Sequence, residues 1–520
     1  MGRGGLRITI VGAGPAGLYF ALLMKKQNPA HAITLLERDG PNDTFGWGIV
    51  FSERTVSVLR DSDPDTGAEI ARRCETWDDV AVVHKGERTT VGGNKFYGVA
   101  RIALLNILHR RCLAHGVEIR FHANVSDVLP LEECDLLVGA DGANSLVRRA
   151  YADFFLPSVD LRQNRYIWLG TEQLFDGLTL TFRQTDAGLF TAHSYRFNKT
   201  TSTFIVECPP ETWLHASLDR MSGEETCAYL AEVFKRDLAG RPLLSNNFVK
   251  WFNFPLVKNK RWHHRNVALL GDALHTAHFS IGSGTKLALE DAIALAGCFA
   301  EHGSVAAALP AFERVREPFV DEFQQAAYES LTWLEHVGEH LHLDPVPFTY
   351  RLMTRSGRVG YNRLKQKDPA FIERYDRWRQ EHPSRGPIPE EFLDLFRKRT
   401  FAHLATQMPD GTPQVTSVWV DYDGRHVLVN SAKGRQKDRN MEQRRYVALE
   451  ITDPDDPNRY LAIRGPVVEI TEEGADEHVD RLAQRYLGQE KYPATWRFPG
   501  EVRRIYKIAP KHVTVWNPFG

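Results

Sequence analysis

Three glycines near the start of the chain, spaced G-x-G-x-x-G over Gly12–Gly17, have the arrangement that binds the pyrophosphate of a dinucleotide. The first glycine of such a motif allows a tight turn, the second lets the backbone approach the phosphates, and the third lets a helix pack close to a sheet. Glu37 follows twenty residues after Gly17, where a carboxylate accepts hydrogen bonds from a ribose hydroxyl. The pattern predicts a dinucleotide site, with FAD and NAD both open at this point. The expected contacts are Gly12, Gly14, Ala16, Gly17, Glu37 and Arg38.

This motif lies between a strand and a helix, as phosphate binding requires. Leu6–Val11 is a short apolar, β-branched run typical of a buried parallel strand, and Leu18–Lys26 has the pattern of the helix that follows. Ala32–Leu36 is a second such strand and ends directly before Glu37. A phosphate at the start of the helix gains from free N–H groups and from the helix dipole. The order strand, turn, helix, strand predicts a Rossmann-type α/β fold.

Two further predicted strands end in a glycine beside an aspartate. The run from Asp135 leads into Asp141-Gly142, and Val267–Leu270 leads into Gly271-Asp272. A glycine-bearing segment after the second turn begins a long predicted helix. Glycines at a helix start expose N–H groups, and an aspartate at a strand end can bind a hydroxyl or a phosphate-linked oxygen. The expected cofactor contacts therefore include Asp141, Gly142, Asp272, Gly282, Gly284 and Thr285.

Two segments between these turns carry other candidates. The aromatic, glycine-rich Phe45–Ser52 suits a loop whose backbone, at Gly48, lies against a flat ligand; a surface loop with its rings tucked into the core fits as well. Arg101 opens an amphipathic helix, Ile102–His115, and either caps it or reaches a phosphate. The region from about 165 to 255 then holds four strand-like runs, which predict an inserted antiparallel sheet. Such a sheet usually covers the cofactor and shapes the substrate pocket.

Together, the elements at Gly12–Gly17, Asp141-Gly142 and Gly271–His275 resemble those of the p-hydroxybenzoate-hydroxylase-type, single-component FAD monooxygenases. The resemblance covers about Leu6 to Lys367. His275–Lys286, in which Phe279 replaces the family's usual proline, looks most like the salicylyl-CoA 5-hydroxylases and 2-aminobenzoyl-CoA monooxygenases; Gly46–Ser52 and Thr354–Arg358 fit the same subgroup. This implies that an FAD hydroperoxide, formed with O2, hydroxylates an aromatic acid or its coenzyme A thioester.

The resemblance leaves the electron donor open. The sequence has no second G-x-G-x-x-G for a separate NAD(P)H domain, as is normal in this family, and NAD(P)H remains open as a donor. His275 and His278 are the titratable groups nearest to the implied flavin ring, and they are our candidates for catalytic proton transfer. Each also fits a residue that begins a helix or packs in the core.

A charged, proline-bearing stretch at 381–389 predicts a linker between an FAD domain at 1–380 and a further domain at 390–520. A short helix, Glu390–Lys398, is expected first. Strand-like runs at 402–407, 414–422, 426–431, 447–452 and 461–469, joined by tight turns, then predict a small split β-barrel. Lys433–Asn440 packs four cations into eight residues, which suits either an anion site or a solvated helix start.

Phe401–Thr406, Gln414–Val420 and this cationic run resemble the deazaflavin (coenzyme F-420) oxidoreductases of the pyridoxamine-phosphate-oxidase-like split-barrel class. Arg459–Glu469 and Tyr486–Gly488 agree, and the resemblance covers Pro389 to the end of the chain. It implies a homodimer in which two subunits share the cofactor site. FMN, haem or no cofactor also occur in the class, and FMN is the alternative that we retain. The residues implied to hold the cofactor's phosphate and acidic tail are Lys433, Arg435, Lys437, Arg439 and Asn440.

Three hypotheses follow for the whole chain. In the first, reduced F-420 in the barrel supplies a hydride and the FAD domain hydroxylates the substrate, with the linker raising the effective concentration of one domain near the other. In the second, the FAD domain oxygenates the ring and the barrel then reduces the product. In the third, the FAD domain uses NAD(P)H and the barrel serves dimerisation alone.

Composition sets outer bounds on these hypotheses. The 520 residues carry a net charge of −1 and are 42% hydrophobic, which is typical of a globular protein and gives no basic excess for nucleic acid. No apolar run approaches the ~18 residues of a membrane span, and the early first strand leaves no room for a signal peptide. Six scattered cysteines lack C-x-x-C spacing, so we expect neither a metal site nor disulfides, and a cytoplasmic location.

Overall fold

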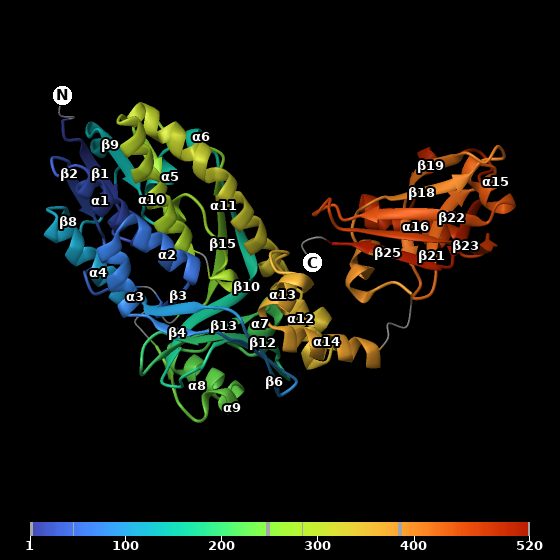
Figure 1. Cartoon of the computed structure of the whole chain (residues 1–520), viewed down its shortest axis with the longest axis horizontal. Coiled ribbons are helices and arrows are strands. Elements are labelled where there is room, and N and C mark those ends of the chain that lie inside the picture. The colour runs from blue at the N-terminus through green and yellow to red at the C-terminus, as the bar shows by residue number, and fades with distance from the viewer. Residues whose placement is uncertain (1–3, 45, 246–249, 283, 383–386, 518–520) are drawn as a thin grey trace. The chain divides into compact units, whose positions relative to one another are not determined.

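The computed structural model describes residues 4–44, 46–245, 250–282, 284–382 and 387–517. The chain divides into two compact units, Met1–Arg374 and Tyr375–Gly520 (Figure 1). Phe45 of the predicted loop, Ser283 of the predicted helix start and residues 383–386 of the predicted linker lie outside the described residues. Among the described residues, no helix is both long and apolar enough to cross a membrane.

A mostly parallel sheet organises the start of the first unit. Its central strand β1 pairs in parallel with β2 on one side and with β9 on the other, and Ile8 lies opposite Ile33 and Leu136. Both neighbours are apolar runs, so the sheet is buried on both faces, as parallel sheets generally are. The strand order is β16 (His263–His264), β17 (Val267–Leu269), β9 (Leu136–Gly139), β1 (Arg7–Val11), β2 (Ala32–Leu36) and β8 (Glu118–Arg120).

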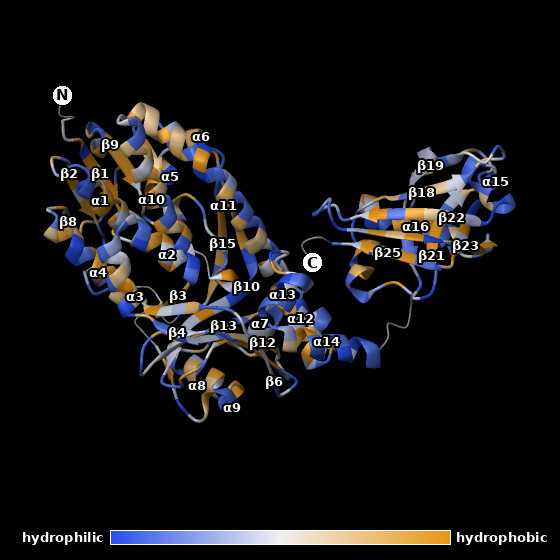
Figure 2. Ribbon diagram, in the orientation of Figure 1, coloured by the Kyte–Doolittle hydropathy of each residue, from blue (hydrophilic) through white to orange (hydrophobic). Residues whose placement is uncertain are grey.

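Helices enclose this sheet and complete one hydrophobic core. α1 (Pro15–Gln27) packs against both α4 (Arg101–Ala114) and α10 (Gly284–His302). Apolar residues concentrate on β1, β9 and α1 in Figure 2. The parallel order and the covering helices confirm the Rossmann-type fold predicted from the sequence. The helices α2 (Glu53–Ser62), α3 (Pro64–Arg72), α5 (Leu146–Ala150), α6 (Ala152–Phe155) and α11 (Val305–Glu335) belong to the same unit.

An antiparallel sheet forms the other half of this unit, as predicted. Its strand order is β14 (Leu243–Leu244), β10 (Pro157–Thr171), β13 (Ser202–Cys208), β12 (Gly188–Arg196), β11 (Leu178–Thr185), β5 (Val80–His84) and β6 (Glu87–Val91), and β15 (Phe252–Asn259) also pairs with β10. The sequence did not predict β5 and β6, which precede the 165–255 region; β5 joins β11 in parallel register. The covering helices are α7 (Pro210–His215), α8 (Gly223–Val233), α9 (Lys235–Leu238), α12 (Pro345–Thr354) and α13 (Tyr361–Lys367), and α14 (Pro369–Glu381) follows.

The segment predicted as a loop at Phe45–Ser52 is a strand from Gly48 onward, which corrects that prediction. β3 (Gly48–Ser52) pairs antiparallel with β7 (Phe96–Ala100), which also pairs with β4 (Glu75–Trp77). The physical reason is that Ile49, Val50 and Phe51 favour extended backbone and find a partner strand almost fifty residues away. Two flanking glycines suggested a loop because that partner could not be read locally.

The second unit is an antiparallel barrel, as predicted. The long strand β23 pairs with β22 and then, across a bulge between Val467 and Glu469, with β24, so one strand serves both halves. Its strand order is β19 (Pro413–Val418), β18 (Ala402–Gln407), β22 (Tyr446–Thr452), β23 (Tyr460–Thr471), β24 (Arg503–Ile508), β21 (Val427–Ala432) and β20 (Val420–Tyr422), with β25 (His512–Trp516) beside β23 and the helices α15 (Gln436–Gln443) and α16 (Ala475–Leu487).

Three details of this unit differ from the sequence prediction. The strand expected at 414–422 is interrupted at Trp419, between β19 and β20. Glu390–Phe396 forms a 3-10 helix, shorter than the helix predicted over 390–398. The strands β24 and β25 were not predicted. β24 has the sequence RRIYKI, which lacks the alternation of a half-buried strand, and β25 is a mostly exposed run of only five residues.

Candidate functional site

The turn after β1 places three glycines in three different environments. A Cβ atom on Gly12, whose φ is +102°, would lie 2.3 Å from the carbonyl oxygen of Ala140. A Cβ on Gly17 would lie 2.3 Å from the carbonyl oxygen of Gly12, whereas a Cβ on Gly14 would meet nothing within 4 Å. The first and third glycines are therefore required by close backbone packing, and the second faces open space.

That open space adjoins the start of α1. Gly14 is the N-cap of this helix and supplies no side-chain hydrogen bond, Pro15 follows it, and the first turn carries no acidic residue. The N-terminal N–H groups of a helix are donors without helical partners, and the helix dipole favours negative charge there. Ala16 is buried in the same turn. A phosphate group can approach the backbone here as the motif predicts.

Glu37 lies at the end of β2, beside this turn. One carboxylate oxygen accepts a hydrogen bond from the backbone N–H of Ala13 at 2.7 Å, and the other accepts from the N–H of Asp39 at 3.0 Å. Arg38 is largely exposed and forms an ion pair with Asp39, with 3.3 Å between Nε and Oδ2. The structure thus brings Glu37 to the glycine turn and leaves Arg38 at its rim.

The two aspartate turns meet the glycine turn from the sides. Asp141 accepts the N–H of Leu146 at 2.6 Å through Oδ2, while its Oδ1 is buried and has no hydrogen-bond partner among the described residues. A Cβ on Gly142, with φ +78°, would meet nothing within 4 Å. Arg148 Nη1 donates to the carbonyl oxygen of Ala273 at 2.9 Å and so joins the two aspartate turns. A Cβ on Gly271 would lie 3.0 Å from the Cβ of Ala16 on α1.

Arg101 and Asp272 face each other in a recess of the protein. Asp272 is exposed to solvent, yet desolvation by the surrounding protein raises the pKa of its carboxyl, against the opposing charge of Arg101. Desolvation likewise lowers the pKa of Arg101, whose Nε is buried without a partner among the described residues. We infer from this combination that the two residues lie at a concave surface, which is called the recess below. Both side chains therefore keep hydrogen-bonding capacity for a bound group.

Gly48 is used differently from its prediction. Its N–H donates to Thr203 Oγ1 at 2.9 Å, and its carbonyl oxygen accepts from the Tyr195 hydroxyl at 2.7 Å. A Cβ there would lie 2.6 Å from the Cβ of Phe197. These contacts fasten β3 to the antiparallel sheet, so the structure gives Gly48 a packing role. Its contact with the cofactor stays a prediction.

The two faces of the antiparallel sheet differ around β12 and β13, where one face is mainly apolar and the other carries the polar side chains called the polar face below; on β11 the same side carries the apolar Leu180 and Phe182. Ile167, Phe190 and Phe204 point into a core shared with α8, which lies below the sheet in Figure 1. Because side chains alternate along strands, His193 and Glu207 point to the opposite face, together with Tyr195 and Thr203, which bind Gly48. The polar face of the sheet is thus turned toward the elements that surround Arg101.

His278 lies against this polar face within a group of aromatic rings. Its ring is 1% exposed and packs edge-on against Phe254, with 4.9 Å between centroids, and next to Phe279 at 4.0 Å. Burial lowers the pKa of His278 to about 4, against the charge of Glu207, so the imidazole is neutral at pH 7. Tyr166 packs on Phe279 at 5.0 Å, and desolvation together with Asp272 raises the pKa of its hydroxyl to about 12.

His275 belongs to a buried ion cluster. Its Nε2 lies 2.8 Å from Asp291 Oδ2, and Arg316 Nε donates to Asp291 Oδ1 at 2.8 Å. Burial works to raise the pKa of Asp291, but His275 and Arg316 hold it below its usual range. The cluster joins η2 (Gly271–Ala273) to α10 and α11. These contacts give His275 a structural role, and its role in proton transfer stays a prediction.

The start of α10 completes the predicted set. Gly282, with φ +62°, ends the 3-10 helix η3 (Phe279–Ile281), and a Cβ on it would meet nothing within 4 Å. Gly284 begins α10, and Thr285 follows in its first turn, which carries no acidic residue. The structure thus brings the three predicted turns together through the contacts of Gly12 with Ala140, Glu37 with Ala13 and Gly271 with Ala16. Arg38 lies at the rim, Gly48 packs against the antiparallel sheet, His275 lies beside Asp291 and His278 lies among the aromatic rings.

Sequence reasoning missed the polar residues of the sheet face. Glu207 is 2% exposed; it accepts from Asn164 Nδ2 at 2.9 Å and lies 3.3 Å from His193 Nε2. Arg355, in the segment after α12, donates to the carbonyl oxygen of Ser280 at 2.8 Å, and burial lowers its pKa to about 10. The available signal was ionisable residues inside otherwise apolar strand runs, such as Glu207 between Val206 and Cys208.

The cationic run of the barrel separates into buried and exposed residues. Lys437 is 9% exposed, and desolvation, together with Arg435 and Arg503, lowers its pKa to about 8. Lys433 pairs with Glu472 at 3.3 Å, and Arg435 lies 3.6 Å from Glu501. Lys437 has no ion-pair partner among the described residues.

The last two residues of the run bind within the barrel. Arg439 is exposed and donates to Gln436 at 3.0 Å. Asn440 is fully buried, donates to Thr406 and Gln414, and accepts from Gln436 at 2.9 Å. The structure therefore brings together Arg435, Lys437 and Arg503 as a cationic group. Arg503 was not predicted. The side chain of Asn440 forms its hydrogen bonds with other protein side chains.

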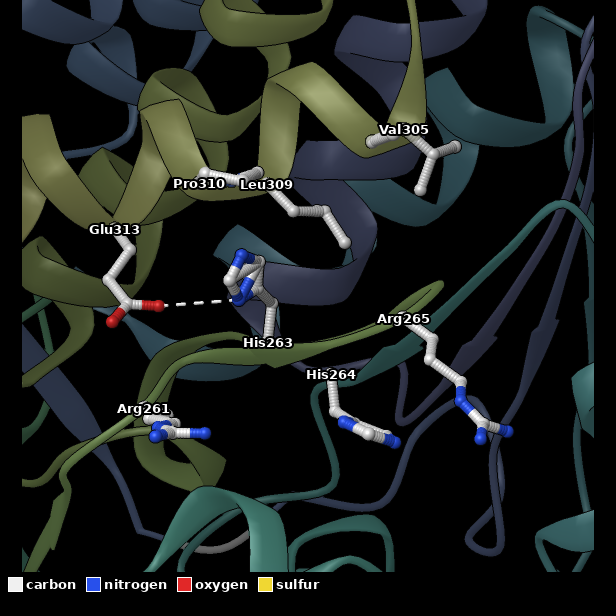
Figure 3. Close-up of a pocket in the computed structure, with 9 residues that line it drawn as sticks. Arg261, His263, His264, Arg265, Val305, Leu309, Pro310 and Glu313 are labelled. Atoms are coloured by element: carbon white, nitrogen blue, oxygen red, sulfur yellow. Dashed lines mark ion pairs between the residues drawn. The ribbon is translucent and has the colours of Figure 1, made fainter.

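A separate cavity of about 380 Å³ lies at the β16–β17 hairpin and the start of α11 (Figure 3). Figure 3 shows His263 pointing toward α11, where its Nδ1 lies 3.4 Å from the carboxylate of Glu313. Glu313 also accepts from the backbone N–H of Trp262 at 3.1 Å. None of the predicted site residues lines this cavity, and its ion pair fastens the hairpin to the helix.

The residues around the recess fit FAD. Gly14 and Gly142 leave room, Asp141 Oδ1 and Arg101 Nε are buried polar atoms without a protein partner among the described residues, and Glu37 is already oriented. The family model described as "FAD binding domain" matches residues 6–327. The chain belongs to the FAD-binding monooxygenase family. The model described as "Pyridoxamine 5'-phosphate oxidase" matches residues 388–517, the barrel.

Three relatives of this FAD monooxygenase support the family assignment. It is 39% identical over 398 residues to a salicyloyl-CoA 5-hydroxylase of Streptomyces, covering 74% of this chain and 76% of the relative. It is 37% identical to the protodeoxyviolaceinate monooxygenase of Chromobacterium violaceum, covering 66% and 92%. It is 35% identical to the 3-hydroxy-4-methyl-anthranilyl-[aryl-carrier protein] 5-monooxygenase of Streptosporangium sibiricum, covering 71% and 99%.

Solved structures confirm the fold of this monooxygenase. 2-Methyl-3-hydroxypyridine-5-carboxylic acid oxygenase matches with a TM-score of 0.54 at 19% identity, covering 68% of this chain and 96% of the other. PqsL of Pseudomonas aeruginosa matches with a TM-score of 0.52 at 21% identity, covering 65% and 99%. The predicted resemblance to an FAD monooxygenase fused to a split barrel is confirmed.

Proposed function

We propose that this FAD-dependent monooxygenase hydroxylates an aromatic ring carried as an acyl thioester. The observation that carries the proposal is the polar face of the antiparallel sheet, which adjoins a group of aromatic rings and the Arg101–Asp272 recess. Two of the relatives are named for aromatic acyl groups held on coenzyme A or on a carrier protein. FAD, when bound, supplies the activation of O2 and the transfer of one oxygen atom.

The protein's own residues bind and orient the reactants. Gly14 and the start of α1 receive the pyrophosphate, and Glu37 receives the ribose. Arg101 and Asp272 keep hydrogen bonds free at the base of the recess. Tyr166 and Phe279 form an apolar wall suited to a flat ring and exclude water from it. His278 contributes a neutral imidazole to the same wall.

We further propose that the barrel binds coenzyme F-420 and supplies the hydride that reduces FAD. Arg435, Lys437 and Arg503 support this role, because three clustered cations whose single carboxylate partner, within the described part of the chain, is Glu501 suit a phosphate and an acidic tail. FMN, with one phosphate and no acidic tail, is the alternative. The attraction between these cations and an anionic cofactor should weaken with salt, since the Debye length falls from about 10 Å at 0.1 M to about 3 Å at 1 M.

We propose that the barrel also forms a homodimer through the open face of β18, β22 and β23. This face carries a recess of about 310 Å³ whose lining combines the small residues Ala405, Ala448 and Ala462 with the polar His403, Glu450 and Arg464. Val415 is 63% exposed and Tyr446 is 54% exposed nearby. Small side chains allow two sheets to approach closely, and exposed apolar residues mark association surfaces. Ala448→Arg should convert a dimer to a monomer in light scattering, while Glu477→Arg on the exposed side of α16 should not.

One experiment tests the electron route. The purified protein is mixed with reduced F-420 and, separately, with NADH in the absence of O2, and bleaching of the FAD absorbance is recorded. Bleaching by F-420 alone, lost in the Lys437→Ala/Arg439→Ala variant with an unchanged FAD content, is the expected result. Bleaching by NADH alone would reject hydride supply by the barrel.

Stoichiometry separates hydroxylation from the two-step alternative. Hydroxylation consumes one hydride donor per O2, whereas oxygenation followed by ring reduction consumes two. The measurement pairs donor oxidation with an oxygen electrode in the presence of an aromatic coenzyme A thioester. Free salicylate or anthranilate serves as the comparison substrate, and equal turnover of the free acid would reject the thioester.

A further inference from the structure

Glu207 is an ionised carboxylate held inside the protein, on the polar face of the antiparallel sheet. It is 2% exposed, and although burial works to raise its pKa, hydrogen bonds from His193 and Asn164 hold that pKa below its usual range. A buried charge is costly unless it is paired and hydrogen-bonded. Asn164 Nδ2 donates to Oε1 at 2.9 Å, and His193 Nε2 lies 3.3 Å from Oε2.

The contact with Glu207 determines which nitrogen of His193 can accept a proton. A carboxylate beside Nε2 stabilises the tautomer with its hydrogen on Nε2, which leaves Nδ1 as the acceptor. Among the described residues, Nδ1 has no hydrogen-bond partner. The ring lies edge-on to Phe279, with 5.3 Å between centroids, on the wall of aromatic side chains. The imidazole therefore presents a free acceptor at the place proposed for the substrate ring.

His278, the histidine predicted from the sequence, is less suited to this task. Its Nδ1 already accepts the backbone N–H of Ser280 at 3.3 Å, and burial lowers its pKa to about 4. A group with so low a pKa is a weak base near pH 7. His193 has the carboxylate partner that His278 lacks as a direct hydrogen-bond acceptor.

We propose that His193 accepts the proton of a ring hydroxyl on the aromatic substrate, with Glu207 as the positioning residue that holds its accepting tautomer. The O–H bond breaks, an N–H bond forms at Nδ1, and the electron pair stays on the substrate oxygen, where it enriches the ring for attack. The charge of the resulting imidazolium is offset by Glu207. This inference rests on the proposed function and narrows its substrate class to hydroxylated aromatic acyl thioesters.

The test compares two probes, 2-hydroxybenzoyl-CoA and benzoyl-CoA, on the FAD holoenzyme. Without O2 or reductant, binding of the hydroxylated probe to the wild type should produce phenolate absorbance. In turnover, general base catalysis contributes about 10²–10⁴-fold, so His193→Gln should lose roughly that factor in kcat/KM for the hydroxylated probe. Glu207→Gln should lose phenolate absorbance as well, and Glu207→Asp should recover part of it. Glu232→Gln, on the exposed face of α8, is the matched control.

The outcomes separate this inference from the proposed function. FAD content and thermal unfolding establish that each variant is folded, and His193→Asn replaces His193→Gln if the latter loses FAD. If the wild type hydroxylates the thioester and the His193 and Glu207 variants keep phenolate absorbance and kcat/KM, the proton-acceptor role is rejected and the proposed function stands. If the wild type binds and turns over neither probe, the proposed function fails, and this inference fails with it.

Discussion

The backbone N–H of Ala13 donates to a carboxylate oxygen of Glu37 across 2.7 Å and joins the glycine turn to the end of β2. Because Asp39 N–H holds the other oxygen at 3.0 Å, the carboxylate is oriented before any nucleotide binds. A preoriented acceptor loses little conformational freedom on binding. Each carboxylate oxygen has more than one lone pair, so the oxygen that binds Ala13 can also accept a ribose hydroxyl.

Replacing Glu37 tests this arrangement. Glu37→Ala should weaken FAD binding by roughly 1.5–3 kcal/mol, the range for a hydrogen bond to a charged group. The dissociation constant is measured by the return of flavin fluorescence on dilution. Glu118→Ala removes an exposed carboxylate from the neighbouring strand β8 and should leave FAD affinity unchanged. Equal affinity in wild type and Glu37→Ala would show that the ribose is held elsewhere.

Two glycine variants should fail in different ways. Gly12→Ala puts a Cβ 2.3 Å from the Ala140 carbonyl oxygen at φ +102°, so we expect a lower melting temperature of the FAD-free protein, with backbone strain alone costing about 1–3 kcal/mol. Gly14→Ala meets no protein atom within 4 Å and has an ordinary φ of −75°, so the FAD-free protein should keep its melting temperature and lose FAD affinity. Equal loss of stability in both variants would contradict the assignment of open space at Gly14.

The local patterns were predicted from the sequence because their physical causes are local. Gly12–Gly17 and Glu37 follow from a strand, a turn and a helix within one short segment. The pairing of β5 with β11 joins segments about a hundred residues apart, and no periodicity within either strand reveals it. The ion pair of His275 with Asp291 was missed for the same reason, since the partner lies on the next helix. His193 and Glu207 meet only across paired strands.

Asp291 should contribute to the free energy of unfolding only while its carboxyl is ionised. Asp291→Asn removes one of the two carboxylates that pair with buried Arg316 and leaves Glu290 at 2.9 Å. The loss of stability should therefore stay below the about 3–5 kcal/mol that breaking a buried pair costs. The folded pKa of Asp291 is below the unfolded value, so its contribution is present above the unfolded pKa, about 3.9, and is lost as pH falls through the lower folded pKa. Urea unfolding against pH measures this. Glu53→Gln, which breaks the exposed pair with Lys95, should change little.

The low pKa of Lys437 predicts that the unfolding stability of the barrel and its affinity for an anionic ligand both depend on pH. Desolvation and the charges of Arg435 and Arg503 lower its pKa from 10.5 to about 8. Between these two values the unfolded chain binds a proton that the folded barrel does not, so unfolding stability should rise with pH there. Lys437→Met should abolish this rise, whereas Arg439→Met, at an exposed position, should retain it.

A bound anion raises the pKa of Lys437, because its negative charge favours the ammonium form. F-420 binding near pH 8.5 should therefore take up a proton, and affinity should fall as pH rises above about 8, the pKa of Lys437. Calorimetric titration in two buffers of different ionisation enthalpy measures the uptake. Lys437→Met should bind more weakly and without uptake, while Arg439→Met should keep the uptake. Proton uptake that survives in Lys437→Met would assign the titrating group to another residue and remove Lys437 from the anion site.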